Sequence, residues 1–512
     1  MTDDTPVPLS LETLDALPPA VERPSYARED LSPGIVHLGP GNFHRAHQGI
    51  YLDRLMNAGR DRDWGIVGAS VMPGDATLRD ALIAQDCLTT VVEQTGASSE
   101  ARVTGVMLDY VPPADGKAIL AALADPAIRI VSMTVTEGGY YVDAESGHFD
   151  ATHEAIRTDA ARIGPGGNEG LLGAGAARPG DTPRTVFGLI VRALRERREA
   201  GHGAFTVMSC DNLPHNGRVA REAVVGTARL ADPDLADWIG ANARFPNAMV
   251  DRIVPATGDR ERRLVAEEHG VADRAPVFCE DYRQWVLEDD FVDGRRPSFE
   301  TVGVEIVEDV TPWELMKIRI LNGGHATIAY PAGLLDVEFV DAAIARPAVR
   351  AFLEKVEREE ILPIVPPVPN TDLERYLGSV VSRLENPKIG DTVRRLCFDG
   401  SNRQPKFIVP SVRDRLAQGL PVEGLALESA LWCRYCFGET EGGRTIEPND
   451  PSWDALTARA REAKEDPHAW LAMREVYGTL GEDERFAKPF GRWLEALWRD
   501  GTEAVLERYL GS

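Results

Sequence analysis

One short stretch of the chain concentrates residues that could carry out proton chemistry. Residues 314–325 read ELMKIRILNGGH and include Glu314, Lys317, Asn322 and His325. At about 100° per residue, a helix places Glu314, Lys317 and His325 in one narrow arc, with Asn322 at its edge. The apolar side chains between them point elsewhere and can pack. The spacing therefore predicts a helix with one polar, reactive face.

These residue types suit the oxidation of an alcohol by a nicotinamide cofactor. As hydride leaves the carbon, a base must take the hydroxyl proton, and a lysine serves when burial or nearby positive charge lowers its pKa. An asparagine amide can donate to the developing alkoxide, and a histidine can hold a neighbouring oxygen. Glu314, one turn before Lys317, could pass the proton to water. An ordinary amphipathic helix with an ion pair is the alternative.

A glycine-rich turn near the N-terminus is the candidate cofactor site. The segment GPGNFHRA begins at Gly39 and follows a short apolar run. Gly39 and Gly41 allow a sharp turn and a close approach of the backbone to a pyrophosphate. His44 occupies the place of the usual third glycine, so an ordinary strand-to-helix turn is the alternative.

The residues after the second expected strand bear on the choice of cofactor. Asp75 is the acidic residue available to bind the ribose hydroxyls, which favours NAD, although NADP stays possible. Three histidines, His37, His44 and His47, lie around the turn, but no nearby cysteine or carboxylate completes a tetrahedral ligand set. We therefore predict no metal site.

The surrounding segments alternate between strand-like and helical patterns. Buried strands are expected at 34–38, 65–71, 128–136 and 204–210, and helices at 43–57 and 185–198. This is the βαβ pattern of a nucleotide-binding sheet, where ligands bind at the carboxyl ends of the strands. Polar residues such as Asp211 and Asn212 follow the strand at 204–210.

From about residue 311 helical spacing dominates. Helices are expected at 312–331, 338–361, 371–385, 407–418, 424–437, 453–463, 467–479 and 485–511. We predict an α/β Rossmann-type N-terminal domain at residues 1–305, followed by a mainly α-helical C-terminal domain at 306–512 that carries the substrate and catalytic residues. The Gly-, Ala- and Pro-rich stretch 163–184 is expected to be an exposed insertion without a catalytic role.

Composition limits the possible partners. The net charge is −25, which argues against nucleic acid and anionic membranes and favours a neutral substrate. Six cysteines in 512 residues do not form a disulfide framework, and the pair Cys433 and Cys436 is expected to be two small apolar residues on a helix. No stretch is long and apolar enough for a membrane span, and the first residues lack the features of a signal peptide. We expect a cytoplasmic monomer or small homo-oligomer.

Several segments together resemble the mannitol 2-dehydrogenase family of polyol-specific long-chain dehydrogenases. The resemblance covers nearly the whole chain. The matching segments are GIVHLGPGNFHRAHQ at 34–48, TVTEGGYY at 134–141, FTVMSCDNLPHNG at 205–217, FPNAMVDRIVP at 245–255, WVLEDDF at 285–291, LMKIRILNGGH at 315–325 and RRLCFDGSNRQPKFIVPS at 394–411.

The resemblance implies hydride transfer without a metal ion and assigns roles to the polar residues. Lys317 would be the general base, and Asn212 and Asn322 would hold the alkoxide or carbonyl oxygen. His325 would bind and orient the substrate. Glu314 would control proton exchange with solvent.

The resemblance also implies binding residues. Asp251 and Arg395 match positions that contact substrate hydroxyls. Gly39, Gly41 and Arg45 fall in the cofactor turn.

The expected reaction is the NAD-dependent oxidation of a sugar alcohol to a ketose, with D-mannitol to D-fructose favoured, and the reverse reduction. A D-arabinitol 4-dehydrogenase and a fructuronate reductase are alternatives within the family. A cofactor-binding protein that has lost catalysis is the alternative from another class.

Overall fold

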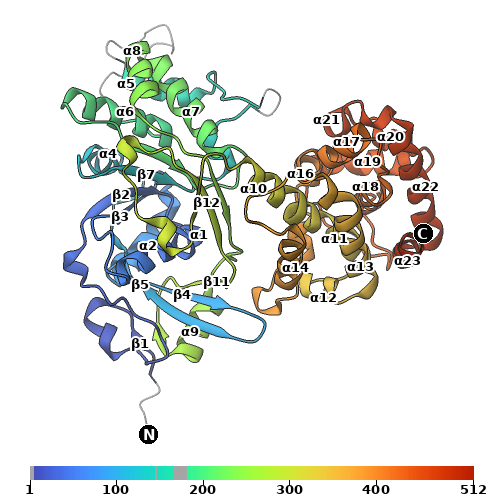
Figure 1. Ribbon diagram of the computed structural model, residues 1–512, viewed down its shortest axis with the longest axis horizontal. Helices are drawn as coiled ribbons and strands as arrows, with labels where there is room; N and C mark the ends of the chain where they lie inside the picture. The colour runs from blue at the N-terminus through green and yellow to red at the C-terminus, as the bar shows by residue number, and fades with distance from the viewer. Residues whose placement is uncertain (1–4, 144–146, 165–180, 512) are drawn as a thin grey trace. The chain divides into compact units, whose positions relative to one another are not determined.

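The computed structural model describes residues 5–143, 147–164 and 181–511. It divides into two compact units, one ending at Val310 and one beginning at Thr311. The first unit is α/β and the second is helical, which confirms the predicted fold class (Figure 1). Most of the predicted insertion, residues 165–180, lies outside the described residues.

A parallel five-stranded sheet forms the centre of the first unit. The strand order is β6 (Met107–Tyr110), β3 (Gly65–Ala69), β2 (Pro33–Leu38), β7 (Ile130–Met133) and β8 (Thr206–Ser209). The chain starts at β2, runs outward to β6 and returns to the other side of β2 at β7. This is the Rossmann order, and ligands bind where the direction of winding reverses. Here that point lies between the carboxyl ends of β2 and β7.

Both faces of the sheet are buried, which explains why its strands read as continuous apolar runs. Alternate residues point to opposite faces, so Val36 and Ile35 belong to different cores. One core includes residues of α4 (Gly116–Ala124), α6 (Val186–Glu199) and α7 (Asn216–Ala231). The other includes α2 (Gln48–Asn57) and a second small sheet.

Two three-stranded sheets of the first unit were not predicted. One has the order β11 (Val277–Glu280), β4 (Thr89–Gln94), β5 (Ser99–Thr104), and the other β13 (Glu305–Val307), β12 (Gln284–Glu288), β9 (Ala248–Asp251). Their strands pair across long sequence distances, and β9 pairs with the antiparallel β12. The second sheet matters for the site because β9 ends at Asp251.

The prediction of one continuous helix over 43–57 was wrong. Helix α1 (Asn42–Ala46) ends before His47, whose backbone leaves helical geometry at φ −116° and ψ −86°, and α2 follows. The His47 ring stacks on Phe43 and lies against Trp285, and its Nε2 is 3.0 Å from the carbonyl oxygen of Gln284. These contacts to distant residues override the local helical pattern.

The second unit is built from helices around α18 (Glu423–Cys436), and no strand is assigned in its described part, 311–511. Every residue of α18 after Glu423 is buried, as expected for a helix surrounded by others. It packs against α11 (Gly323–Leu334), α13 (Pro347–Val356), α19 (Trp453–Ala463) and α22 (Glu484–Asp500) (Figure 1). Among the described residues, no helix has the length and apolarity needed to cross a membrane.

Candidate functional site

The turn after β2 uses its two glycines differently. Gly39 has φ +88°, and a Cβ there would lie 2.3 Å from the carbonyl oxygen of Thr134, so only glycine fits. At Gly41 a Cβ would have a single neighbour, the Gly39 oxygen at 3.9 Å. The first glycine sets the backbone path, and the second leaves room for a bulky group to approach. The turn therefore fits the pyrophosphate of a dinucleotide.

Arg45 braces this turn from the inside. Its guanidinium is buried, donates to the carbonyl oxygen of Ala275, and donates to Asn42 Oδ1 at 2.7 Å. Asn42 in turn donates to Thr257 Oγ1 at 2.6 Å. Burial lowers the pKa of Arg45 to about 10, so the side chain stays charged at neutral pH. The described contacts of Arg45 connect the turn to the segment around residues 257–275.

Asp75 ends a short 3₁₀ turn, η3 (Pro73–Asp75), that follows β3. The Ser70 hydroxyl donates to the Asp75 carboxylate, which points the side chain back toward the carboxyl end of the strand. The pKa of Tyr110 is raised first by burial and then by the charge of Asp75. A carboxylate at this edge of the sheet fits the ribose-binding role predicted from the sequence.

The loop after β8 is fixed by the carboxylate of Asp211, which the sequence placed after this strand without predicting a role for it. Asp211 accepts hydrogen bonds from the backbone N–H groups of Val135 and Thr136, each at 2.9 Å, and from the Tyr140 hydroxyl at 2.7 Å. Burial raises the pKa of Asp211, and these donors lower it. Asp211 thereby joins the loops that follow β7 and β8, and the exposed Asn212 comes next in the chain.

A second buried side chain, Asn216, connects the same loop to β9. Its Nδ2 donates to the carbonyl oxygens of Asp211 at 3.0 Å and Ala248 at 2.8 Å, and its Oδ1 accepts from the Ala248 N–H at 2.8 Å. Ala248 begins β9, which ends at the buried Asp251. Asn216 therefore ties the loop that carries Asn212 to the strand that carries Asp251.

In the second unit, the predicted regular helix over 312–331 was wrong at its centre. Helix α10 (Thr311–Met316) is followed by a π-helical turn, η7 (Lys317–Asn322), and then by α11. Ideal α-helical geometry would set Lys317 and Asn322 about 140° apart. Hydrogen bonds in a π-helix span five residues, so residues five apart come closer to one side. The turn thus brings Asn322, which the helical spacing placed at the edge of the polar arc, closer to the side of Lys317.

Burial and anchoring distinguish this turn from a solvated helix. Glu314 is 6% exposed and Lys317 is 8% exposed. The neighbouring Arg319 donates to the carbonyl oxygen of Ile364 at 2.7 Å and pairs with Asp414. An amphipathic surface helix would leave its charged side chains in water, so the burial of both Glu314 and Lys317 favours a functional role.

Gly323 and Gly324 follow the π-helical turn, with His325 next in the chain. A Cβ at Gly324 would lie 3.3 Å from Glu357 Oε1 and 3.3 Å from Leu353 Cδ1. The glycine therefore permits close packing of α11 against α13 and the π-helical turn η8 (Glu357–Ile361). His325 is half-buried at the start of α11.

Arg395, on the short helix α15 (Val393–Leu396), is the more exposed of the two predicted substrate-binding residues. Its side chain is 52% exposed and is paired with Asp391 through two nitrogens. The hydrogen bond and charge of Asp391 raise the pKa of Arg395.

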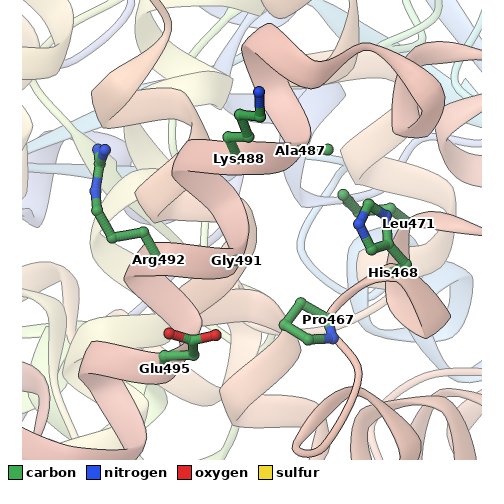
Figure 2. Close-up of a pocket in the computed structure, with 8 residues that line it drawn as sticks. All are labelled: Pro467, His468, Leu471, Ala487, Lys488, Gly491, Arg492 and Glu495. Carbon is green, nitrogen blue, oxygen red and sulfur yellow. The ribbon is translucent and has the colours of Figure 1, made fainter.

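One cavity of the second unit is lined by none of these residues. It has a volume of about 390 Å³ and lies between α20 (His468–Leu471) and α22 (Figure 2). Two of its cations are already paired, Lys488 with Glu484 at 2.7 Å and Arg492 with Glu423. It contains none of the predicted site residues, and we assign it no role.

Within the described part of the chain, no three His, Cys, Asp or Glu side chains are grouped so as to hold a metal ion. Cys433 and Cys436 are both buried on α18, as expected for two small apolar residues on a helix.

Comparison with known proteins matches both units. Residues 33–301 match the mannitol dehydrogenase Rossmann domain, and residues 309–498 match the mannitol dehydrogenase C-terminal domain. A mannitol 2-dehydrogenase of Cereibacter sphaeroides is 58% identical over 494 residues, which cover 96% of this chain and 99% of that protein.

Two solved structures resemble the chain along nearly its full length. The Pseudomonas fluorescens mannitol 2-dehydrogenase, in a ternary complex with NAD and D-mannitol, is 40% identical with a TM-score of 0.84 and covers 99% of this chain and 100% of that one. A D-sorbitol dehydrogenase in substrate-free form is 36% identical with a TM-score of 0.87 and covers 97% and 100%. The resemblance inferred from the sequence motifs is confirmed: the chain belongs to the mannitol dehydrogenase family.

Proposed function

We propose that this enzyme oxidises D-mannitol to D-fructose with NAD and catalyses the reverse reduction. The observation that carries the proposal is the match, over 99% of the chain, to an enzyme whose structure contains NAD and D-mannitol. The Rossmann strand order and the open second glycine of the β2 turn support it from the chain itself.

Gly39, Gly41, Arg45 and Asp75 would hold the cofactor. Gly41 leaves space for the pyrophosphate, Arg45 fixes the turn, and Asp75 would accept from the ribose hydroxyls. When bound, NAD supplies the acceptor for the hydride. A carboxylate at Asp75 would repel the 2′-phosphate of NADP, so NAD is the proposed cofactor and NADP the weaker one.

The proton chemistry is assigned to the second unit. Lys317 would take the proton from the reacting hydroxyl, and Glu314 would pass it on to solvent. Asn322, together with Asn212 from the first unit, would donate to the oxygen as negative charge develops on it. His325 would orient the substrate. A lysine base fits a mechanism without a metal ion, which we propose as well.

Asp251 and Arg395 would bind the hydroxyls of the substrate that do not react. A keto-hexuronate would require a cation for its carboxylate, and Arg395 is already paired with Asp391. This pairing favours a neutral polyol over fructuronate. D-arabinitol stays a weaker alternative.

D-sorbitol is the second candidate substrate because a D-sorbitol dehydrogenase matches the chain with a TM-score of 0.87. D-sorbitol and D-mannitol differ in configuration at one carbon, and the similarity of the two folds does not separate them.

We propose in addition that residues 1–305 bind the cofactor, that 306–512 carry the catalytic residues, and that the enzyme is a monomer or small homo-oligomer.

A substrate panel tests the proposal. The purified protein is assayed for reduction of NAD and NADP with mannitol, sorbitol and arabinitol, and for the reverse reaction with fructose and fructuronate. The proposal expects the highest kcat/KM with mannitol and NAD, and activity that survives EDTA. A higher kcat/KM with sorbitol than with mannitol would make sorbitol the preferred substrate. A loss of activity in EDTA that zinc restores would overturn the metal-independent mechanism.

A further inference from the structure

We propose that His37 is a positioning residue for the cofactor turn, and that it acts through a one-directional chain of hydrogen bonds from Gln48 to Ser132, His37, Thr134 and the carbonyl of Gly39. The inference rests on the proposed function, because it assigns a role in binding NAD. His37 itself is fully buried and cannot touch a ligand.

The five groups form a continuous line across the point where the sheet reverses its winding. His37 lies on β2, and its Nδ1 is 2.8 Å from Ser132 Oγ on the neighbouring β7. Its Nε2 is 3.0 Å from Thr134 Oγ1, and that hydroxyl donates to the Gly39 oxygen at 2.6 Å. At the other end, Ser132 Oγ is 3.0 Å from Gln48 Oε1, in an amide whose oxygen and nitrogen can exchange places by a rotation of about 180°.

The charge state of His37 limits how the protons can be arranged. Burial lowers the pKa of His37 to about 3, so the ring is neutral at physiological pH and has one N–H donor and one acceptor. Because the Thr134 hydroxyl donates to Gly39, it can only accept from His37. The proton of His37 is therefore on Nε2, and Nδ1 accepts.

The directions of the hydrogen bonds that involve Ser132 and Gln48 follow from this assignment. Ser132 must donate its one hydroxyl proton to His37 Nδ1. At its other contact, with the Gln48 amide, the Ser132 oxygen can therefore only accept, and the amide nitrogen of Gln48 is the donor. The orientation with Oε1 facing Ser132 leaves Gln48 Nε2 buried without a partner among the described residues and sets two acceptors, His37 Nε2 and the Thr134 oxygen, against each other, so we assign the rotated amide. With Nε2 facing Ser132, each of the four hydrogen bonds has one donor and one acceptor, and the chain runs in one direction toward Gly39.

The hydrogen-bond chain ends at Gly39, the residue on which the turn depends. The Gly39 carbonyl accepts from Thr134 and also from the Gly41 N–H at 2.7 Å, which holds the turn at φ +88°. The His37 ring also stacks on His44 of α1, with ring centroids 3.5 Å apart. The chain therefore fixes the turn before the cofactor arrives, and such preorganisation contributes to binding without a direct contact.

The first test compares three variants of similar size by direct titration of NAD. Thr134→Val removes the hydroxyl, Thr134→Ser keeps it, and Thr301→Val is the control at an exposed threonine of the same unit. We expect Thr134→Val to weaken NAD binding roughly five- to tenfold, the loss of one hydrogen bond, with kcat at saturating NAD and the KM for mannitol unchanged. Thr134→Ser and Thr301→Val should bind NAD as the unmodified protein does.

The second test asks whether His37 and Thr134 act through one chain. NAD affinity is measured for His37→Phe, Thr134→Val and the double variant, with thermal midpoints to verify folding. The proposal expects the double variant to bind no more weakly than the weaker single variant. The proposal would be overturned if the losses of NAD affinity in the two single variants multiplied in the double variant. Equal NAD affinity of Thr134→Val and Thr134→Ser would also overturn it. If the unmodified protein did not bind NAD, the proposed function would fail first, and the positioning role with it.

Discussion

The cofactor turn of the first unit and the π-helical turn of the second solve the same problem, the placement of polar groups, in different ways. A chain of hydrogen bonds from Gln48 through His37 and Thr134 ends at Gly39, and Arg45 donates to Asn42 and to the carbonyl oxygen of Ala275. Beside η7, Glu357 is fully buried, and among the described residues neither of its oxygens has a hydrogen-bond partner. Burial holds the pKa of Glu357 well above its usual value.

This difference suits the two tasks. A binding site for an invariant cofactor gains from a preorganised frame, and a site for proton transfer gains from groups whose pKa values burial has moved. The comparison predicts that changes in the first unit act mainly on NAD affinity. Changes in the second unit should act on the chemical step or on the pH dependence of stability.

The largest expected effect is that of Lys317→Ala. Loss of the general base should lower kcat by at least about a thousandfold while the affinity for NAD stays unchanged. The control is Lys488→Ala, because Lys488 lies on the exposed surface of α22 and pairs only with Glu484 among its described ion pairs. Turnover and NAD titration are measured on each variant. Near-normal turnover of Lys317→Ala would contradict the role of the lysine.

Gly41→Val should weaken NAD binding and leave kcat nearly unchanged, the opposite of Lys317→Ala. The branched side chain would fill the open space at the second glycine, so we expect NAD affinity to fall about ten- to a hundredfold. At saturating NAD, kcat should change little. Gly203→Val, at another glycine with open space around it and outside the cofactor turn, is the control. Equal effects of the two substitutions would argue against a pyrophosphate at Gly41.

The pH dependence of stability should depend on Glu428, which is buried in the second unit. Burial raises the pKa of Glu428 to about 8, while the hydrogen bond from Gln404 lowers it. The folded state therefore keeps a proton that the unfolded state releases near its ordinary pKa. Stability contributed by this group is fully present below about pH 4.5 and is lost as the pH rises toward about 8.

The variant Glu428→Gln removes this titration and keeps the acceptor for Gln404. Between about pH 4.5 and about pH 8, the unfolding free energy of this variant should fall less steeply with pH than that of the unmodified protein. The two slopes should differ by at most about 1.4 kcal/mol per pH unit, as measured by urea unfolding at several pH values. Glu484→Gln, at an exposed glutamate, should retain the slope. An unchanged slope in Glu428→Gln would show that the carboxyl does not titrate in the way described.

The smallest expected effect is that of Glu357→Met. A carboxyl that has no hydrogen bond among the described residues is costly to bury, and an apolar side chain of similar length removes that cost. We expect stabilisation by about 1–2 kcal/mol at pH 7, seen as a higher midpoint of thermal unfolding. A lower midpoint would show that Glu357 makes a stabilising interaction.

The sequence predicted the Rossmann strands around Gly39 because their buried runs and glycine turn are local signals. It did not predict the π-helical turn, since the segment is anchored by the contacts of Arg319 with Ile364 and Asp414, which lie far along the chain. Helical periodicity assumes a constant angle per residue and cannot register such a change.

The candidate site shows the same limit. Residue types and spacing identified Lys317 and its neighbours, but the supporting roles of Asp211 and Asn216 depend on partners after β7 and at the start of β9. The only local signal was that Asp211 directly follows a buried strand. The network through His37 was equally hidden, because its members lie on β2, α2 and β7.

Chemical rescue of Lys317→Ala is the most direct test of the proposed mechanism. The variant, saturated with NAD and mannitol, is assayed with increasing concentrations of methylamine at fixed pH and ionic strength. If Lys317 is the base, free amine should restore turnover in proportion to its concentration, and the unmodified enzyme should not respond. A variant that binds NAD normally but shows no response to amine would contradict the assignment of Lys317 as the group that removes the proton.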